Sequence, residues 1–391
     1  LSPAPFGNAA DAAYVEAANY ETDLNKISEC DLVIEAIAER MDWKHDLYAK
    51  VAPHLAPHAI FASNTSGLSI NELAKGFDDE LKKRFCGVHF FNPPRYMHLV
   101  ELIPTAHTEA ATMDNLESFA TTTLGKGVVR AKDTPNFIAN RVGVFSILAV
   151  MAEAQKYGLG FDLVDDLTGS KLGRAKSATF RTADVVGLDT MAHVIKTMED
   201  NLKDDPFAAN YPVPPVLKVL VEKGALGQKS GAGFYRKEGK EIKVLDAAKG
   251  EYVAGGTKAD ELVARILKKP AAERFKLLRE TDHPQAQFLW SIFRDVFHYI
   301  AVHLESIADN ARDVDFAVRW GFGWNEGPFE TWQAAGWKEI AGWIAEDIAA
   351  GKTLSSAPLP AWVNEIDAVH TPAGSYSPAK KAFVPRSNLA V

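Results

Sequence analysis

A histidine and a glutamate in this chain fall on neighbouring segments with the pattern of buried strands. His89 follows the apolar run at residues 85–88 and Glu101 lies within residues 99–103, with an Asn-Pro-Pro turn between them. Short apolar runs bounded by turn residues are typical of strands, and such a turn brings consecutive strands together. The pair can therefore form a dyad in which the imidazole moves a proton and the carboxylate fixes its tautomer. The alternative is a purely structural histidine.

Strands and helices are expected to alternate on both sides of this pair. The pattern predicts further strands at 31–36, 59–62 and 127–130, and helices at 43–55, 70–75 and 116–124, the first with Trp43 on its apolar face. Such alternation predicts a mostly parallel sheet, in which ligands sit beyond the carboxyl ends of the strands. Polar residues follow three of the expected strands, at 36–39, 63–66 and 89–92. Three polar clusters along one edge indicate a site.

Composition excludes several classes of protein. A chain of 391 residues is expected to form two or three domains. Its 43 basic and 51 acidic residues give a net charge of −8, which argues against nucleic acid or an anionic membrane as a partner. Cys30 and Cys86 lack the spacing of a metal site and suit a reducing compartment. With no long apolar segment and no signal peptide, we expect a cytoplasmic protein without metal.

No Gly-x-Gly-x-x-Gly motif precedes the expected strands. A dinucleotide-binding fold normally opens with that turn, because its glycines let the backbone approach the pyrophosphate. We interpret the sequence as beginning after that first unit. On this interpretation, the chain would bind NADH far more weakly than a longer parent would.

Five motifs together resemble the 3-hydroxyacyl-CoA dehydrogenases of fatty-acid β-oxidation. They occur in the family's order and at similar spacing, and the resemblance covers about residues 25–345. The motifs are Asp-Leu-Val-Ile-Glu-Ala-Ile-Ala-Glu at 31–39, Ala-Ser-Asn-Thr-Ser at 62–66, His-Phe-Phe-Asn-Pro at 89–93, Leu-Val-Glu at 99–101 and Asp-Thr-Pro-Asn-Phe-Ile-Ala-Asn-Arg at 133–141.

The resemblance implies catalytic roles for four residues. His89 would be the general base that takes the hydroxyl proton as hydride leaves for NAD, and Glu101 would orient it. Ser66 and Asn140 would hydrogen-bond the reacting oxygen or the thioester carbonyl. Alternatively, Ser66 could cap the helix near residue 70. Asn is a poor residue inside a helix, which favours a functional role for Asn140.

Three further residues would bind the cofactor if the resemblance holds. Glu39 and Lys44 would face the nicotinamide ribose, and Asn64 would lie near the nicotinamide end of NAD. Glu39 and Lys44 could equally be ordinary surface charges. The family usually has glycine where this chain has Asn136, and Asn tolerates left-handed backbone, so we expect that turn to survive.

The second half of the sequence is mainly helical and contains an internal repeat. Residues 137–188 resemble residues 288–337. Within them, Gly-Phe-Asp-Leu-Val-Asp at 160–165 corresponds to Ala-Arg-Asp-Val-Asp-Phe at 311–316. The position of Asn140 falls near Ser291 in the second copy, which we interpret as a scaffold. The glycine-rich turn at 230–233 is expected to be structural, because it follows a helix and precedes a strand.

These observations predict a fold of the α/β plus all-α class, with a partial Rossmann-like, mostly parallel sheet followed by a duplicated helical domain. The expected divisions are 1–132 (partial NAD-binding domain), 133–236 (first helical domain), 237–282 (linker with a helix), 283–356 (second helical repeat) and 357–391 (tail or linker).

The predicted function is NAD-dependent oxidation of (S)-3-hydroxyacyl-CoA. Two alternatives remain: a non-catalytic module that binds acyl-CoA or partner subunits, and a different hydroxyacid dehydrogenase, against which the His-Phe-Phe-Asn-Pro run argues. The resemblance also suggests a homo-oligomer or an attached enoyl-CoA hydratase domain in the full-length parent.

Overall fold

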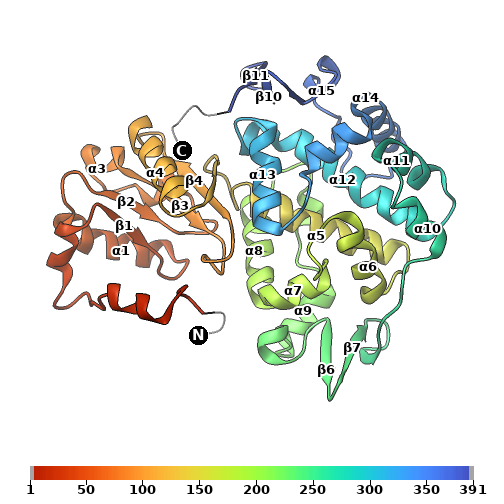
Figure 1. Cartoon of the computed structure of the whole chain (residues 1–391), viewed down its shortest axis with the longest axis horizontal. Coiled ribbons are helices and arrows are strands. Elements are labelled where there is room, and N and C mark those ends of the chain that lie inside the picture. The colour runs from red at the N-terminus through yellow and green to blue at the C-terminus, as the bar shows by residue number, and fades with distance from the viewer. Residues whose placement is uncertain (1–3, 387–391) are drawn as a thin grey trace. The chain divides into compact units, whose positions relative to one another are not determined.

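A computed structural model describes residues 4–386, which divide into two compact units. The first runs up to Phe137 and takes in Ser306–Asp309, and the second comprises Ile138–Glu305 and Asn310–Pro385 (Figure 1). Among the described residues, no helix is both long and apolar enough to cross a membrane.

The first unit is built on a five-stranded sheet. Its strands lie in the order β1-β2-β3-β4-β5, and every neighbouring pair is parallel except β3 and β4. The mostly parallel sheet predicted from the sequence is therefore confirmed. The strands are β1 Leu32–Glu35, β2 Ile60–Ser63, β3 Phe85–Phe90, β4 Leu99–Pro104 and β5 Gly127–Arg130, and the helices are α1 Met41–Val51, α2 Ile70–Leu73, α3 Asp79–Lys83 and α4 Ala110–Thr122.

Helix α1 turns a different face to the sheet than the apolar pattern predicted. Trp43 is half exposed, whereas Lys44, Tyr48 and Val51 are buried at i, i+4 and i+7. A buried carboxylate on β1 accounts for this, because it supplies the partner that makes burial of a lysine tolerable.

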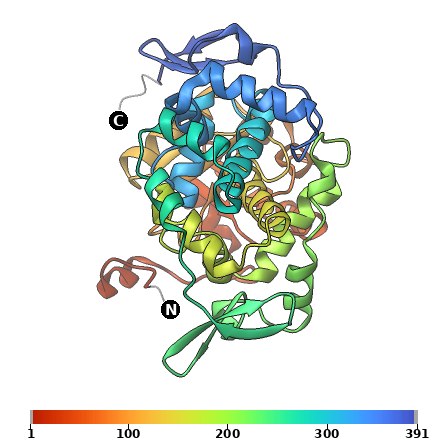
Figure 2. The same cartoon turned by 90° about the vertical axis from the view of Figure 1, so that its right-hand side faces the viewer.

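The second unit is mainly helical. Two small antiparallel sheets, β6-β7-β8 and β9-β10-β11, lie at opposite ends of it (Figure 2). The helices are α5 Ala139–Lys156, α6 Phe161–Thr168, α7 Phe180–Val186, α8 Leu188–Asn201, α9 Pro215–Glu222, α10 Glu261–Ile266, α11 Ala271–Glu280, α12 Pro284–Ile307, α13 Ala311–Phe322, α14 Pro328–Ala349 and α15 Trp362–Glu365. The strands are β6 Tyr235–Glu238, β7 Glu241–Asp246, β8 Glu251–Ala254, β9 His370–Thr371, β10 Gly374–Ser377 and β11 Ala382–Val384.

The duplication predicted from the sequence is visible in the backbone of this unit. We call α5–α9 with β6 the first copy, and α12–α14 with β9–β11 the second copy. Gly187, with φ 100°, separates α7 from α8, and Gly336, with φ 110°, kinks α14 at the matching point. Asp165 and Asp315 occupy matching positions, because each binds backbone N–H groups at the start of the next helix. The alignment of 160–165 with 311–316 pairs Asp165 with Phe316 instead, so it is wrong by one residue.

Two segments differ from the expected linkers. Residues 237–282 contain strands of the β6–β8 sheet and helices α10 and α11, and Phe275 and Leu278 of α11 are fully buried. The expected tail carries α15 and the β9–β11 sheet, and its side chains Trp362, Val369 and Tyr376 are buried. Up to Pro385, this segment belongs to the second compact unit.

Candidate active site

His89 and Glu101 form a buried pair on adjacent strands. They lie directly opposite each other in the antiparallel β3–β4 pairing, so their side chains share one face of the sheet. Nδ1 of His89 is 2.8 Å from Oε2 of Glu101, and the two residues are 3% and 0% exposed. A hydrogen bond from Nδ1–H to the carboxylate fixes the imidazole orientation and leaves Nε2 as the nitrogen that can exchange a proton.

Aromatic rings hold the imidazole from two directions. The ring centroid of His89 lies 4.6 Å from that of Phe91 and 5.5 Å from that of Phe137. Phe137 reaches this place through a turn in which it and Asn136 have φ values of 52° and 63°. The turn therefore keeps its left-handed backbone with Asn136, as the sequence predicted.

Asn64 supports the strand that carries His89. Its side-chain oxygen accepts a hydrogen bond from the backbone N–H of Phe90 at 2.9 Å. The backbone N–H of Asn64 donates to the carbonyl of Glu35 at 2.7 Å. Asn64 thus joins the carboxyl ends of β1, β2 and β3, which places it at the edge of the sheet where ligands are expected.

A second buried polar cluster lies at the carboxyl ends of β1 and β2. The ammonium group of Lys44, which is 0% exposed, lies 2.6 Å from Oε1 of Glu35. Tyr48 and Ser63 donate hydrogen bonds to Oε2 of Glu35 at 2.6 and 2.8 Å. Burial and the adjacent Glu35 carboxylate raise the pKa of Tyr48, which keeps its phenol a donor.

Sequence reasoning missed the central role of Glu35. The signal was a glutamate inside an otherwise apolar strand, which needs a buried partner. Lys44 is that partner, so it is not an ordinary surface charge.

Glu39 lies beside this cluster and remains partly exposed. Its Oε1 is 3.8 Å from the ammonium of Lys44, and its Oε2 accepts a hydrogen bond from the hydroxyl of Thr65 at 2.6 Å. The structure therefore brings Glu39 and Lys44 together, and their cofactor-binding roles stay predictions. The side chain of Glu39 is 29% exposed, which leaves it accessible to a ligand.

Ser66 does not cap the helix that follows it. The N-cap of α2 is Ser69, whose hydroxyl accepts from the N–H of Glu72 at 3.2 Å. The carboxylate of Asp133 also accepts the N–H of Ile70 at 2.9 Å. The capping alternative is therefore wrong, and Ser66 is half-buried in the loop between β2 and α2.

Asn140 lies in the helical unit, as the second residue of α5, and is half-buried. The sequence pattern predicts a position in the interior of a helix for this residue. Asn is well tolerated in the first turn, where backbone N–H groups lack intrahelical partners, so its position no longer demands a functional explanation. Its catalytic role remains a prediction.

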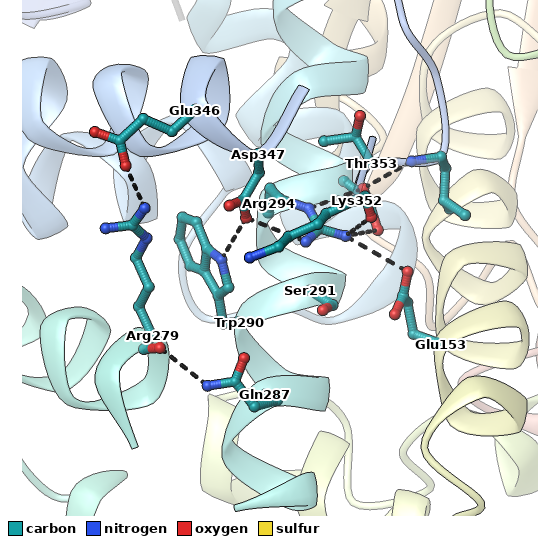
Figure 3. A network of polar contacts seen from close by, with 12 residues as sticks. Glu153, Arg279, Gln287, Trp290, Ser291, Arg294, Glu346, Asp347, Lys352 and Thr353 are labelled. Carbon is teal, nitrogen blue, oxygen red and sulfur yellow. Dashed lines mark hydrogen bonds and ion pairs between the residues drawn. The ribbon is translucent and has the colours of Figure 1, made fainter. Parts of the chain in front are cut away.

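Ser291, the counterpart of Asn140, is buried inside the helical unit and contacts another side chain rather than solvent. It is 1% exposed, and its hydroxyl is 3.3 Å from that of Tyr157. One turn along α12, the buried guanidinium of Arg294 contacts the carboxylates of Asp347 at 3.2 Å and Glu153 at 3.5 Å (Figure 3). This network ties the second copy to α5 of the first.

Comparisons with known proteins point to one family. Residues 6–134 match the family model of the 3-hydroxyacyl-CoA dehydrogenase NAD binding domain, and residues 137–237 match the model of its C-terminal domain. A probable 3-hydroxyacyl-CoA dehydrogenase of Bacillus subtilis is 40% identical over 365 residues, which cover 93% of this chain and 45% of that protein. The chain thus spans about half the length of this relative.

Two further relatives have more of their length covered. A probable 3-hydroxyacyl-CoA dehydrogenase of Deinococcus radiodurans is 46% identical over 235 residues, which are 60% of this chain and 67% of that protein. The crystal structure of 3-hydroxybutyryl-CoA dehydrogenase from Escherichia coli matches with a TM-score of 0.64 at 22% identity, covering 88% of this chain and 82% of that chain. At that identity, the structural match supports the fold alone.

Proposed function

Because the chain belongs to the 3-hydroxyacyl-CoA dehydrogenase family, we propose that it oxidises (S)-3-hydroxyacyl-CoA to 3-ketoacyl-CoA with NAD in fatty-acid β-oxidation. The observation that carries this proposal is the buried His89–Glu101 pair, whose closest atoms are 2.8 Å apart. An imidazole has an ordinary pKa near ~6.5, which suits proton transfer near neutral pH.

His89 is the general base in this proposal. Its Nε2 takes the proton of the substrate hydroxyl, since Nδ1 is bound to Glu101. The Glu101 carboxylate stabilises the imidazolium that forms and keeps the ring oriented. We assign Ser66 and Asn140 to hydrogen bonds with the reacting oxygen or the thioester carbonyl, because neutral donors position an oxygen without adding charge.

The cofactor-binding part of the proposal rests on the polar groups at the carboxyl ends of β1 and β2. NAD supplies the hydride acceptor when it is bound. Glu39 and Asn64 offer a carboxylate and an amide there, which suit the hydroxyl groups of the ribose and the carboxamide of the nicotinamide, and the buried ammonium of Lys44 lies 3.8 Å from the Glu39 carboxylate. The Glu35–Lys44 pair holds the ammonium in place before a ligand arrives.

Partners and compartment complete the proposal. Two Rickettsia relatives at 34% and 33% identity are named as putative trifunctional enzymes of a fatty acid oxidation complex. We therefore propose an acyl-CoA substrate and, in a longer protein, an attached enoyl-CoA hydratase domain or a homo-oligomer. Cys30 and Cys86 are both free thiols, which supports a reducing compartment such as the cytoplasm.

Reduction of acetoacetyl-CoA by NADH, the reverse reaction, tests the proposal. His89→Ala should lower turnover by ~10²–10⁴-fold, the usual effect of losing a general base. Glu101→Gln should also lower turnover, because the imidazolium loses its charge partner. His58→Ala is the matched control, since His58 is in the same unit with an exposed side chain paired to Asp31. Unchanged turnover in His89→Ala would exclude this mechanism.

A further inference from the structure

A pocket in the helical unit is lined by both copies and lies outside the candidate active site. It is small, because the centres of water-sized groups can occupy only about 30 Å³ of it. Six of its ten lining residues are apolar or aromatic, and two arginines and one glutamate provide its charges. The lining residues are Leu172, Arg174, Arg274, Phe293, Val296, Phe297, Trp324, Glu326, Pro328 and Thr331.

Arg174 is half-buried and carries a positive charge that no acidic side chain of the described residues pairs with. Its guanidinium stacks on the ring of Trp324 at 4.0 Å and lies 5.6 Å from that of Phe293. Within residues 4–386 it makes no side-chain hydrogen bond and no ion pair. Burial lowers the pKa of Arg174 to about 9, with no carboxylate to oppose the effect. A guanidinium remains charged at neutral pH, so this desolvated cation would be stabilised by an anion.

The surrounding backbone holds Arg174 in position. Its N–H donates to the carbonyl of Gly169 at 3.2 Å, and the carbonyl of the preceding Gly173 accepts the N–H of Asn325 at 2.8 Å. The loop of the first copy is thereby pinned to the matching loop of the second. Together with the stacking of the guanidinium on Trp324, this restricts the side chain, which then loses less freedom when it binds a ligand.

Arg274 supplies a second cation to the same pocket. It is half-buried, and its Nε is a buried donor that has no acceptor among the described residues. Burial lowers the pKa of Arg274, and the carboxylate of Glu326 opposes that effect through its charge alone. Glu326 is exposed, so solvent screens part of its negative charge, and the rest opposes the binding of an anion.

Two other buried arginines of the same unit show what is missing here. Arg141 makes an ion pair with Asp205 at 2.8 Å, and Arg294 contacts three carboxylates. Both follow the rule that a buried charge is paired. The two pocket arginines are half-buried, make no ion pair among the described residues, and both line the same cavity.

We propose that this pocket binds a small oxyanion, a carboxylate or a phosphate group, through the guanidinium groups of Arg174 and Arg274. Planar guanidinium groups match the oxygens of both anions, and the aromatic walls strengthen these contacts by excluding water. The anionic group belongs to a ligand whose remaining part lies at the open side of the pocket.

Calorimetric titration of the purified protein with sodium phosphate and with sodium acetate, at constant ionic strength, tests this proposal. Saturable binding of either ion is expected, and the one that binds more tightly identifies whether the ligand carries a phosphate or a carboxylate. Sodium chloride is the reference ion, and absence of saturable binding by both oxyanions overturns the proposal.

Variants locate the binding. Arg174→Gln and Arg274→Gln should each weaken binding about tenfold or more, whereas Glu326→Gln should strengthen it by removing a like charge. Arg279→Gln is the matched control, because Arg279 lies on α11 with Arg274, pairs with Glu346 and does not line the pocket. Glu326→Gln alters an exposed residue, so it remains informative if an arginine variant fails to fold. Equal affinity in Glu326→Gln and Arg279→Gln would contradict the proposed site.

Discussion

Asp165 in the first helical copy and Asp315 in the second accept hydrogen bonds from backbone N–H groups at matching positions, and they differ in their additional partners. Asp165 accepts the N–H groups of three consecutive residues, Thr179 to Arg181, and the hydroxyl of Tyr235 at 2.7 Å. Asp315 accepts two N–H groups, of Phe329 and Glu330, and its Oδ2 lies 2.6 Å from Nε2 of His370. In both copies a buried carboxylate caps the N-terminus of the following helix, α7 in the first copy and α14 in the second.

A second matched pair lies nearby and differs in charge. The carboxylate of Asp184 accepts the N–H groups of Phe234 and Tyr235, each at 2.9 Å. In the second copy, the amide oxygen of Gln333 accepts the N–H groups of Val369 and His370, each at 2.8 Å. The backbone donors need an acceptor in both places, whereas the charge of that acceptor is free to change.

The largest effect is expected from removing the shared carboxylates. Asp165→Ala removes the acceptor of three backbone N–H groups and the shorter of the two hydrogen bonds of the Tyr235 hydroxyl, which also donates to the carbonyl of Phe161 at 3.3 Å. It should lower the free energy of unfolding by ~3–5 kcal/mol. Asp315→Ala removes the acceptor of two backbone N–H groups and of the His370 ring, and should cost somewhat less. Urea denaturation gives both values, and Asp367→Ala serves as the control because that side chain is 96% exposed. Equal stability of Asp165→Ala and the control would refute this role.

The next largest effect distinguishes a catalytic residue in the first copy from a structural residue at the matching position of the second copy. Asn140→Ala should lower acetoacetyl-CoA reduction by ~10–100-fold, about 1–3 kcal/mol of barrier, with little loss of stability. Ser291→Ala, at the matching place in the second copy, should leave turnover unchanged. Steady-state rates of both variants check this, and comparable kinetic damage from the two substitutions would contradict the interpretation of the second copy as a scaffold.

The smallest expected effect concerns the carboxylate of Asp184, which accepts the N–H groups of Phe234 and Tyr235. Burial raises the pKa of Asp184 to about 6, above its ordinary value of 3.8. The folded state then holds this proton more tightly than the unfolded state, so the contribution is fully present below pH 4 and is lost as the pH rises through 6. Asp184→Asn should reduce the fall in stability between pH 4 and pH 7 by about 1–2 kcal/mol, after allowance for solvent screening.

Gln333 provides the control for that measurement. Because an amide does not titrate, Gln333→Asn should shift the stability by a constant amount across the same pH range. Thermal or urea denaturation at several pH values resolves the two slopes. If Asp184→Asn has the same slope as the wild-type protein, the carboxylate does not titrate differently in the folded and unfolded states.

The sequence predicted those parts of the fold that short-range patterns control. The strand alternation around His89 and Glu101 and the turn between them predicted their pairing, and the structure places them in register. The tolerance of Asn for left-handed backbone predicted the turn at Asn136. Each of these predictions depends on residues within about a dozen positions of one another.

Features that depend on distant partners were not predictable in the same way. The burial of Lys44 in place of Trp43 depends on Glu35, which lies on a strand before the helix. The segment after residue 357 contains five prolines and was expected to be a tail or linker, yet Trp362 and Tyr376 pack against each other with ring centroids 5.5 Å apart. Neither pairing is visible in a local apolar pattern.

The glycines at 187 and 336 have a consequence for recognising related sequences. A residue with a side chain is strained at φ near 100° to 110°, so the helix break can be kept only by glycine while neighbouring side chains diverge. A search for duplicated domains of this kind can therefore use such glycines, spaced by about 150 residues, as fixed points. That criterion would detect an ancient duplication after the similarity between its two halves has become too weak to align.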